Sequence, residues 1–187
     1  MRSLTLLTLV LSVVFAARCS KILVVFPMPA PSHYILGNAY AKTLVEAGHD
    51  VTMVSPFEEK NPPKKGKWRD VVLTGFVEKR DTSSKVQFFD LESMNPFLNI
   101  PFMNMVGNMV TRETLAHPNF QKLIESNEQF DVVVLEQFNN DALKVLAYHF
   151  QAPLDHIQYD WLQLLGQSLG WQSRSSVLHS RNILEVQ

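Results

Sequence analysis

Residues 21–55 read KILVVFPMPAPSHYILGNAYAKTLVEAGHDVTMVS, and this stretch decides the fold class. Its first six residues form a continuous apolar run that ends at Pro27, as expected of a strand buried on both faces. A helix is predicted over residues 34–47, with Gly48 as its stop, and residues 51–55 form a second short strand. Strand, helix and strand in this order constitute a βαβ unit, which implies a parallel sheet.

The rest of the chain continues the same alternation. A solvated polar loop is expected over residues 57–69, a third strand over residues 71–76 and a helix over residues 117–126. The run DVVVL at residues 131–135 is a second clearly buried strand, and a helix with Asp141 as its N-cap follows over residues 141–150. The predicted fold is α/β, an open, doubly wound and mostly parallel sheet.

Composition fits one ordinary domain and excludes several classes of protein. The chain has 187 residues, of which 46% are hydrophobic and 19% charged, so it can form a packed core. A net charge of -1 gives no basic face for nucleic acid. A single cysteine excludes a disulfide scaffold, and no Asn-x-Ser/Thr glycosylation site occurs.

The amino terminus has the features of a secretory signal peptide. Arg2 is followed by a short apolar stretch from Leu4 to Ala17, and small residues then lead to a cleavage site after Cys19. We therefore expect residues 1–19 to be removed and the product to enter the secretory pathway, in the lumen of the endoplasmic reticulum. A membrane anchor or a buried strand is the alternative interpretation of this stretch.

Two titratable residues are expected at the carboxyl edge of the sheet, where open α/β sheets bind their ligands. His33 lies at the start of the first helix, and Glu136 follows the DVVVL strand. A carboxylate hydrogen-bonded to imidazole would fix the tautomer of the ring and stabilise its protonated form during general base catalysis. The alternatives are an exposed residue at a helix start for His33 and a solvent-facing loop residue for Glu136.

Other motifs carry less weight. The chain has no G-x-G-x-x-G, no Walker loop and no metal-binding motif such as H-E-x-x-H. Ser168 stands in a formal G-x-S-x-G match, but His179 and Glu185 follow it in the reverse of the order that a hydrolase requires. The Met-rich segment at residues 95–110 can fill a core or line an apolar pocket, and the residues alone favour core.

The run FPMPAPSHYILGNAYAKTLVEAGHDVTMVSPF resembles the opening of the UDP-glycosyltransferases, particularly the insect type. Further matches are VVLTGF, the segment ETLAHPNFQKLIESNEQFDVVVLEQFNNDAL and the helix end LAYHFQAP. The resemblance covers residues 1–154, signal peptide included.

The resemblance implies the N-terminal half of a GT-B fold, which binds a small lipophilic acceptor, while a C-terminal domain binds the UDP-sugar co-substrate. By motif, His33 is the catalytic base of an inverting sugar transfer. Glu136 stands where vertebrate members commonly have Asp, and Asp141 is the substitute candidate for the carboxylate. The resemblance further implies that residues 97–109 of the Met-rich segment form the acceptor pocket or a membrane-facing surface. The residues that it implies for acceptor binding are Ser32, Tyr34, Phe97, Phe102 and Met105. The resemblance implies no metal and no cofactor in this chain.

The family pattern stops after Leu154. If the coding sequence is read in another frame, from the second base of the Asp155 codon, it can encode the continuation that the family has. In that frame Gly stands at the positions of Trp161 and Trp171. We therefore expect a signal peptide at residues 1–19, an incomplete acceptor domain at residues 20–154, and an out-of-frame, irregular tail at residues 155–187. The strand after Leu154 would then be missing, leaving the DVVVL strand as an unpaired edge.

Without the UDP-sugar domain and a C-terminal membrane anchor, such a chain is expected to be inactive alone. Two other functions remain open: a non-catalytic module that binds apolar ligands or dimerises with full-length relatives, and a hydrolase using Ser168.

Overall fold

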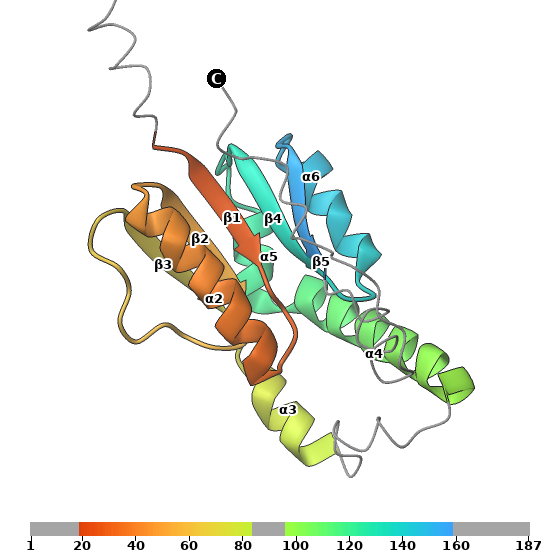
Figure 1. The fold of residues 1–187 in the computed structure, drawn as a ribbon. Helices are drawn as coiled ribbons and strands as arrows, with labels where there is room; N and C mark the ends of the chain where they lie inside the picture. The colour runs from red at the N-terminus through yellow and green to blue at the C-terminus, as the bar shows by residue number, and fades with distance from the viewer. Residues whose placement is uncertain (1–18, 84–95, 159–187) are drawn as a thin grey trace, which may run out of the picture.

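A computed structural model of the chain describes residues 19–83 and 96–158 (Figure 1). Five parallel strands form one sheet in the order β3-β2-β1-β4-β5. The strands are β1 (Lys21–Val25), β2 (Asp50–Ser55), β3 (Lys67–Val72), β4 (Val132–Gln137) and β5 (Leu154–Gln158). The order reverses between β1 and β4, which confirms the predicted doubly wound α/β fold.

Helices cover both faces of this sheet. Helix α2 (Pro31–Glu46) joins β1 to β2 on one face, where Ala41 and Val45 pack against β1 and β2. Helices α5 (Pro118–Ile124) and α6 (Val145–His149) pack on the other face. The remaining elements are α3 (Phe76–Ser83), α4 (Pro96–Ala116) and the short 3-10 helix η2 (Asp141–Lys144).

The predicted βαβ unit is present. Helix α2 begins three residues earlier than expected, because Pro31 occupies its first turn, where the fixed backbone angle of proline suits a helix and no amide hydrogen is needed. It ends before Gly48, whose φ of 102° lies in the left-handed region that favours glycine. The loop between β1 and α2 thus delivers the start of α2 to the carboxyl edge of the sheet (Figure 1).

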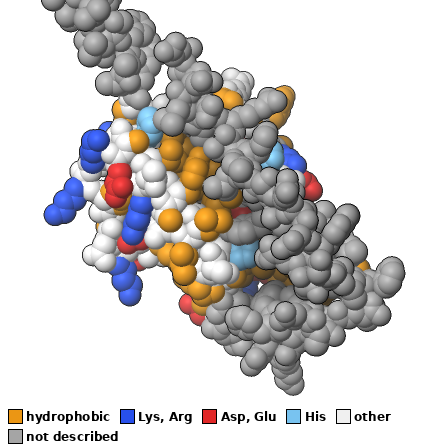
Figure 2. Space-filling view, in the orientation of Figure 1, with side chains coloured by type: hydrophobic (Ala, Val, Ile, Leu, Met, Phe, Trp, Pro, Cys, Tyr) orange, Lys and Arg blue, Asp and Glu red, His pale blue; other side chains and the backbone are white. Residues whose placement is uncertain are grey.

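The predicted third strand is wrong in its position. Strand β3 spans Lys67–Val72, so it begins inside the segment expected to be a polar loop. It is an edge strand whose side chains alternate in exposure, and its sequence KWRDVV therefore lacks a continuous apolar run. Figure 2 shows lysine and arginine side chains gathered on this side of the molecule, a feature that discourages further strand pairing.

The expectation that no strand follows Leu154 is also wrong. Strand β5 pairs in parallel with β4, with Val133 opposite Leu154 and Glu136 opposite Ile157. The sequence LDHIQ contributes Leu154 to one core cluster and Ile157 to the other, which is enough to extend the sheet. Strand β4 is therefore an interior strand rather than an exposed edge.

The Met-rich segment forms helix α4, which is core on one side only. Val106 and Val110 are buried, whereas Met105 and Met109 are 59% and 46% exposed. Among residues 19–83 and 96–158, no helix combines the length and apolar character needed to cross a bilayer. The expected helix at residues 141–150 divides into η2 and α6. The predicted signal peptide up to residue 18, Ser168 and the tail from residue 159 lie outside the described residues.

Candidate active site

His33 is the third residue of α2. Ala30 precedes the helix in an extended conformation, and Pro31 starts it, so the imidazole is carried on a rigid first turn rather than on a loop. The His33 side chain is 15% exposed. The ring is therefore largely enclosed yet still reaches solvent.

Glu136 lies within β4 rather than beyond its end, and its side chain is completely buried. Side chains alternate along a strand, so Glu136 points to the same face as Val134, which packs with the α2-side core. This alternation aims the carboxylate at the first turn of α2. The structure thereby brings together two residues that are 103 positions apart in the chain.

His33 Nδ1 and Glu136 Oε1 form a hydrogen bond. An ionised carboxylate can only accept hydrogen bonds, so Nδ1 carries the proton and donates the hydrogen bond to Glu136. In the neutral ring Nε2 is then the nitrogen that can accept a proton. The second carboxylate oxygen, Glu136 Oε2, is buried and has no hydrogen-bond partner among the described residues. Among the described residues, the hydrogen bond from the imidazole therefore offsets the free-energy cost of burying this carboxylate.

An apolar cluster adjoins the imidazole. The Phe138 and His33 rings pack in a T-shaped arrangement, with 5.0 Å between their centroids and 84° between their planes. Phe138 also packs against a small core formed by the β1–α2 loop and α4, whose members are Met28, Ala30, Phe102, Val106 and Val110. Of the predicted acceptor-binding residues, Phe102 belongs to this cluster, and Met105 lies exposed on the same helix.

The turn after β4 is the part of the site that sequence reasoning missed. Asn139 has a φ of 51°, in the left-handed region, and Asn140 is 3% exposed. Gly107 of α4 packs directly on the backbone of Asn139, where a Cβ atom would collide with the Asn139 carbonyl. The signal was present in the pair Asn139–Asn140, because asparagine tolerates left-handed backbone and bonds its own turn.

Other predicted site residues lie elsewhere. Asp141 is exposed and pairs with Lys144 at 2.6 Å, and it is not the N-cap of η2, which is Asn140. The carboxylate that pairs with His33 is that of Glu136. Ser32 is exposed at the start of α2. Phe97 lies in the first turn of α4, and its side chain is not among those described.

Tyr34 turns toward the β2–β3 loop. Its ring contacts Phe57 at 5.0 Å, and its hydroxyl lies 3.5 Å from Glu59 Oε2. Burial, reinforced by the charge of Glu59, raises the pKa of Tyr34 to about 12. Tyr34 is therefore a neutral hydroxyl, and in this structure it secures the loop.

Glu59 was also missed by sequence reasoning, since it stands in a polar loop that suggested a solvated surface. It accepts hydrogen bonds from Asn38 Nδ2 at 2.7 Å and from the Asn61 amide at 2.7 Å, and it pairs with Lys42 Nζ at 2.8 Å. The hydrogen bond from Lys42 is the main cause that lowers the pKa of Glu59 to about 2. This network fastens the β2–β3 loop to α2.

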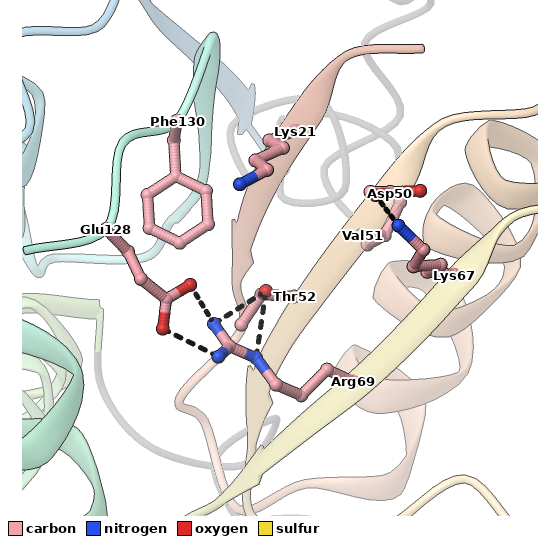
Figure 3. Close-up of a pocket in the computed structure, with 8 residues that line it drawn as sticks. All are labelled: Lys21, Asp50, Val51, Thr52, Lys67, Arg69, Glu128 and Phe130. Carbon is pink, nitrogen blue, oxygen red and sulfur yellow. Dashed lines mark hydrogen bonds and ion pairs between the residues drawn. The ribbon is translucent and has the colours of Figure 1, made fainter. Parts of the chain in front are cut away.

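A separate hollow of about 240 Å³ lies at the opposite, amino-terminal edge of the sheet (Figure 3). There Arg69 forms a two-pronged ion pair with Glu128 and also donates to Thr52 Oγ1. Arg69 lowers the pKa of Glu128. These bonds join β2 and β3 to the segment that precedes β4. Within the described ranges, no three His, Cys, Asp or Glu residues are placed to hold a metal ion.

The fold and this site define an α/β domain with a histidine–carboxylate pair at the carboxyl edge of its parallel sheet. No family model matches the chain. It is 29% identical over 152 residues to an ecdysteroid UDP-glucosyltransferase of Autographa californica nuclear polyhedrosis virus, covering 79% of the chain and 30% of that protein. It is 28% identical over 135 residues to UDP-glucosyltransferase 2 of Dactylopius coccus, covering 72% of the chain and 25% of that protein.

Among solved structures, the calicheamicin glycosyltransferase CalG4 has the same fold, with a TM-score of 0.52 and 18% identity over 86% of this chain and 40% of CalG4. The chain is therefore a relative of the UDP-glycosyltransferases and has the GT-B type of α/β domain, as its sequence motifs predicted. It spans less than a third of the length of these two curated relatives.

Proposed function

We propose that this chain provides the acceptor half of a UDP-glycosyltransferase, with His33 as general base and Glu136 as its partner. The observation that supports this proposal is the hydrogen bond between His33 Nδ1 and the fully buried Glu136. It leaves Nε2 as the basic nitrogen of a ring on the carboxyl edge, where ligands of open α/β sheets bind.

The proposed reaction is a single displacement. His33 Nε2 takes the proton of the acceptor hydroxyl as its oxygen attacks the anomeric carbon of the UDP-sugar. The bond from that carbon to the UDP oxygen breaks, UDP leaves with the electron pair, and the configuration inverts. Glu136 holds the ring in one tautomer and balances the positive charge that the proton brings.

The acceptor class follows from the surroundings of His33. Phe138 contacts the imidazole and packs in one cluster with Phe102, and both side chains are only partly buried, so they offer apolar surface that suits a small lipophilic molecule with one hydroxyl to present. The viral relatives are named for ecdysteroids, so a hydroxylated steroid with UDP-glucose is the first pair to assay.

The proposal assigns the UDP-sugar to a second domain, since the chain matches only 30% of the viral protein's length. We propose that residues 20–158 transfer no sugar by themselves, because the second reactant must also be positioned. A full-length relative that dimerises with these residues would supply the domain that does so. Entry into the endoplasmic reticulum with cleavage near Cys19, and contact of α4 with a membrane surface, belong to the same proposal.

A fusion tests the base directly. Residues 20–158 are joined to the C-terminal domain of the viral ecdysteroid UDP-glucosyltransferase, and glucose transfer to an ecdysteroid and to lipophilic phenols is measured. We expect turnover that His33→Gln lowers by about 10²- to 10⁴-fold. His156→Gln, an exposed histidine on β5, is the matched control and should retain turnover.

Transfer that survives His33→Gln would overturn the assignment of the base. The unfused chain is assayed in parallel. If phenols raise its melting temperature without any transfer in the fusion, a non-catalytic binding module would be the better description.

A further inference from the structure

One side chain holds the turn that follows β4. Asn140 Nδ2 donates to the carbonyl oxygen of Glu136 at 2.8 Å, and Asn140 Oδ1 accepts from the Phe138 amide at 2.9 Å. The Asn140 carbonyl also accepts from the Leu143 amide at 2.9 Å, which starts η2. A single buried amide therefore joins the end of β4 to the beginning of the next helix.

Both residues bonded by this amide contact the imidazole. Glu136 supplies the carboxylate, and Phe138 supplies a ring that packs against His33 in a T-shaped arrangement. Asn140 itself bonds the backbone of both residues. Its influence on the imidazole would thus pass through the position of the Glu136 and Phe138 backbone.

We propose that Asn140 is a positioning residue, which holds Glu136 and Phe138 so that His33 keeps one tautomer with Nε2 as the basic nitrogen. The consequence for catalysis rests on the function proposed above, whereas the effect on the tautomer does not. Asparagine is suited to this place because its amide offers a donor and an acceptor at once. Aspartate would keep the acceptor for Phe138 but set a carboxylate against the Glu136 carbonyl, and alanine would lose both bonds.

The imidazole reports on this arrangement without any need for turnover. In the full chain, ¹⁵N chemical shifts of the His33 ring distinguish a protonated Nδ1 from a protonated Nε2. For the unaltered chain we expect a single tautomer with the proton on Nδ1. In Asn140→Asp and Asn140→Ala we expect averaged shifts, which signal exchange between the two tautomers.

A second asparagine provides the matched control. Asn119 Nδ2 donates to the Val72 carbonyl at 2.8 Å, a bond of the same type and length between α5 and β3. Asn119→Ala should lower the melting temperature but leave the His33 shifts unchanged. The amide fingerprint spectrum shows that each variant is folded, and Asn140→Asp carries the test if Asn140→Ala unfolds.

The outcomes separate the two proposals. A single His33 tautomer retained in a folded Asn140 variant would overturn the role of Asn140 and leave the proposed function standing. Two tautomers in the unaltered chain would overturn the pairing with Glu136 on which both proposals depend. Averaged shifts in Asn119→Ala as well would show a general effect of lost stability, and would also overturn the specific role of Asn140.

Discussion

At the scale of single residues, the length of the Glu136 side chain is the feature most specific to this site. Its backbone is fixed inside β4, where it stands opposite Ile157 of β5. The carboxylate must therefore reach the first turn of α2 from a position that the sheet does not allow to move. The glutamate side chain is long enough to contact His33 in that turn, and its carboxylate is completely buried.

Glu136→Asp should separate the pair, because the carboxylate is withdrawn by one methylene while the strand stays in register. We expect turnover of the fusion protein to fall by about 10²-fold, the typical cost of a misplacement near 1 Å. Glu136→Gln keeps the length and removes the charge, so it shows what the charge contributes. Equal activity of Glu136→Asp and the unaltered fusion, measured as kcat/KM, would contradict the importance of this length.

His117 is a second residue with a defined task, at the junction of α4 and α5. Its Nδ1 accepts the Asn119 amide at 3.2 Å and caps α5, and its Nε2 donates to the Thr74 carbonyl at 3.1 Å. The ring thus joins the turn after β3 to the start of α5. The side chain is buried, so no water easily replaces either bond.

His117→Ala should lower the free energy of unfolding by about 2 kcal/mol, roughly half from the lost cap and half from the lost bond to Thr74. His117→Asn retains a capping oxygen and should recover about half of that loss. Urea denaturation of both variants measures the difference. If the two variants are equally destabilised, the cap is not what His117 contributes.

At the scale of elements, the interior strands were predictable and the edge strands were not. β1, β2 and β4 are buried on both faces. The apolar runs ILVV in β1 and VVVL in β4 are visible in the sequence, whereas β2 reads DVTMVS and is indicated by its place after the first helix. β3 and β5 border the sheet and tolerate Lys67, Arg69 and His156. Their pairing is decided by the neighbouring strand rather than by their own pattern.

The site was predictable to the same degree. His33 and Glu136 follow from the rule that ligands bind at the carboxyl ends of parallel strands. Asn140 and Glu59 do not, because their partners are backbone groups or residues of other elements that come together only on folding. The acceptor-binding roles remain predictions for all five residues, Ser32, Tyr34, Phe97, Phe102 and Met105.

Helix α4 depends on one glycine for its position. A Cβ atom at Gly107 would lie 2.6 Å from the Asn139 Cβ atom and closer still to the Asn139 carbonyl oxygen. Helix and turn are thus in direct backbone contact. Since the turn carries Phe138, the placement of α4 is tied to the surroundings of His33.

Gly107→Ala should cost roughly 1–3 kcal/mol of stability through this overlap, although alanine by itself favours a helix. Asn108→Ala, on the exposed side of the same turn of α4, is the control and should be neutral or slightly stabilising. Thermal unfolding followed by circular dichroism compares the two variants. A Gly107→Ala chain as stable as Asn108→Ala would show that α4 can withdraw from the turn without cost.

At the scale of the whole molecule, the two edges of the sheet have different chemistry. The amino-terminal edge is closed by paired charges, with Lys67 on Asp50 at 3.0 Å and Arg69 on Glu128 at 2.7 Å. The carboxyl edge instead holds a buried carboxylate against a partly exposed imidazole, beside apolar side chains. The ion pairs of Lys67 and Arg69 and the proposed chemistry therefore lie at opposite ends of the strands, so variants of these two ion pairs should leave the His33–Glu136 pair intact.

Acid should destabilise the whole domain through its paired carboxylates. Hydrogen bonds from Lys67, Lys42 and Arg69 lower the pKa values of Asp50, Glu59 and Glu128, respectively. A carboxyl group whose pKa is lower in the folded than in the unfolded chain stabilises the fold above its unfolded value, and that contribution is lost as the pH falls. Burial raises the pKa of Asp70, which acts in the opposite direction.

The pH range over which this stability is lost is best defined for Glu59, whose pKa is lowered from the ordinary 4.5 to about 2. The free energy of unfolding should therefore fall as the pH is lowered across this range, and Glu59→Gln should make the fall shallower. At pH 7 we expect Glu59→Gln to cost roughly 1 kcal/mol, since the pair with Lys42 is partly open to solvent.

Lys42→Met and the double variant complete a cycle measured by urea denaturation at pH 7 and pH 2.5. At pH 2.5 the Glu59 carboxyl is protonated in the unfolded chain but still largely ionised in the folded one, so much of its contribution to stability is lost and the coupling between Glu59 and Lys42 should be clearly smaller than at pH 7. An equal coupling at both values would contradict the assignment of this acid sensitivity to Glu59.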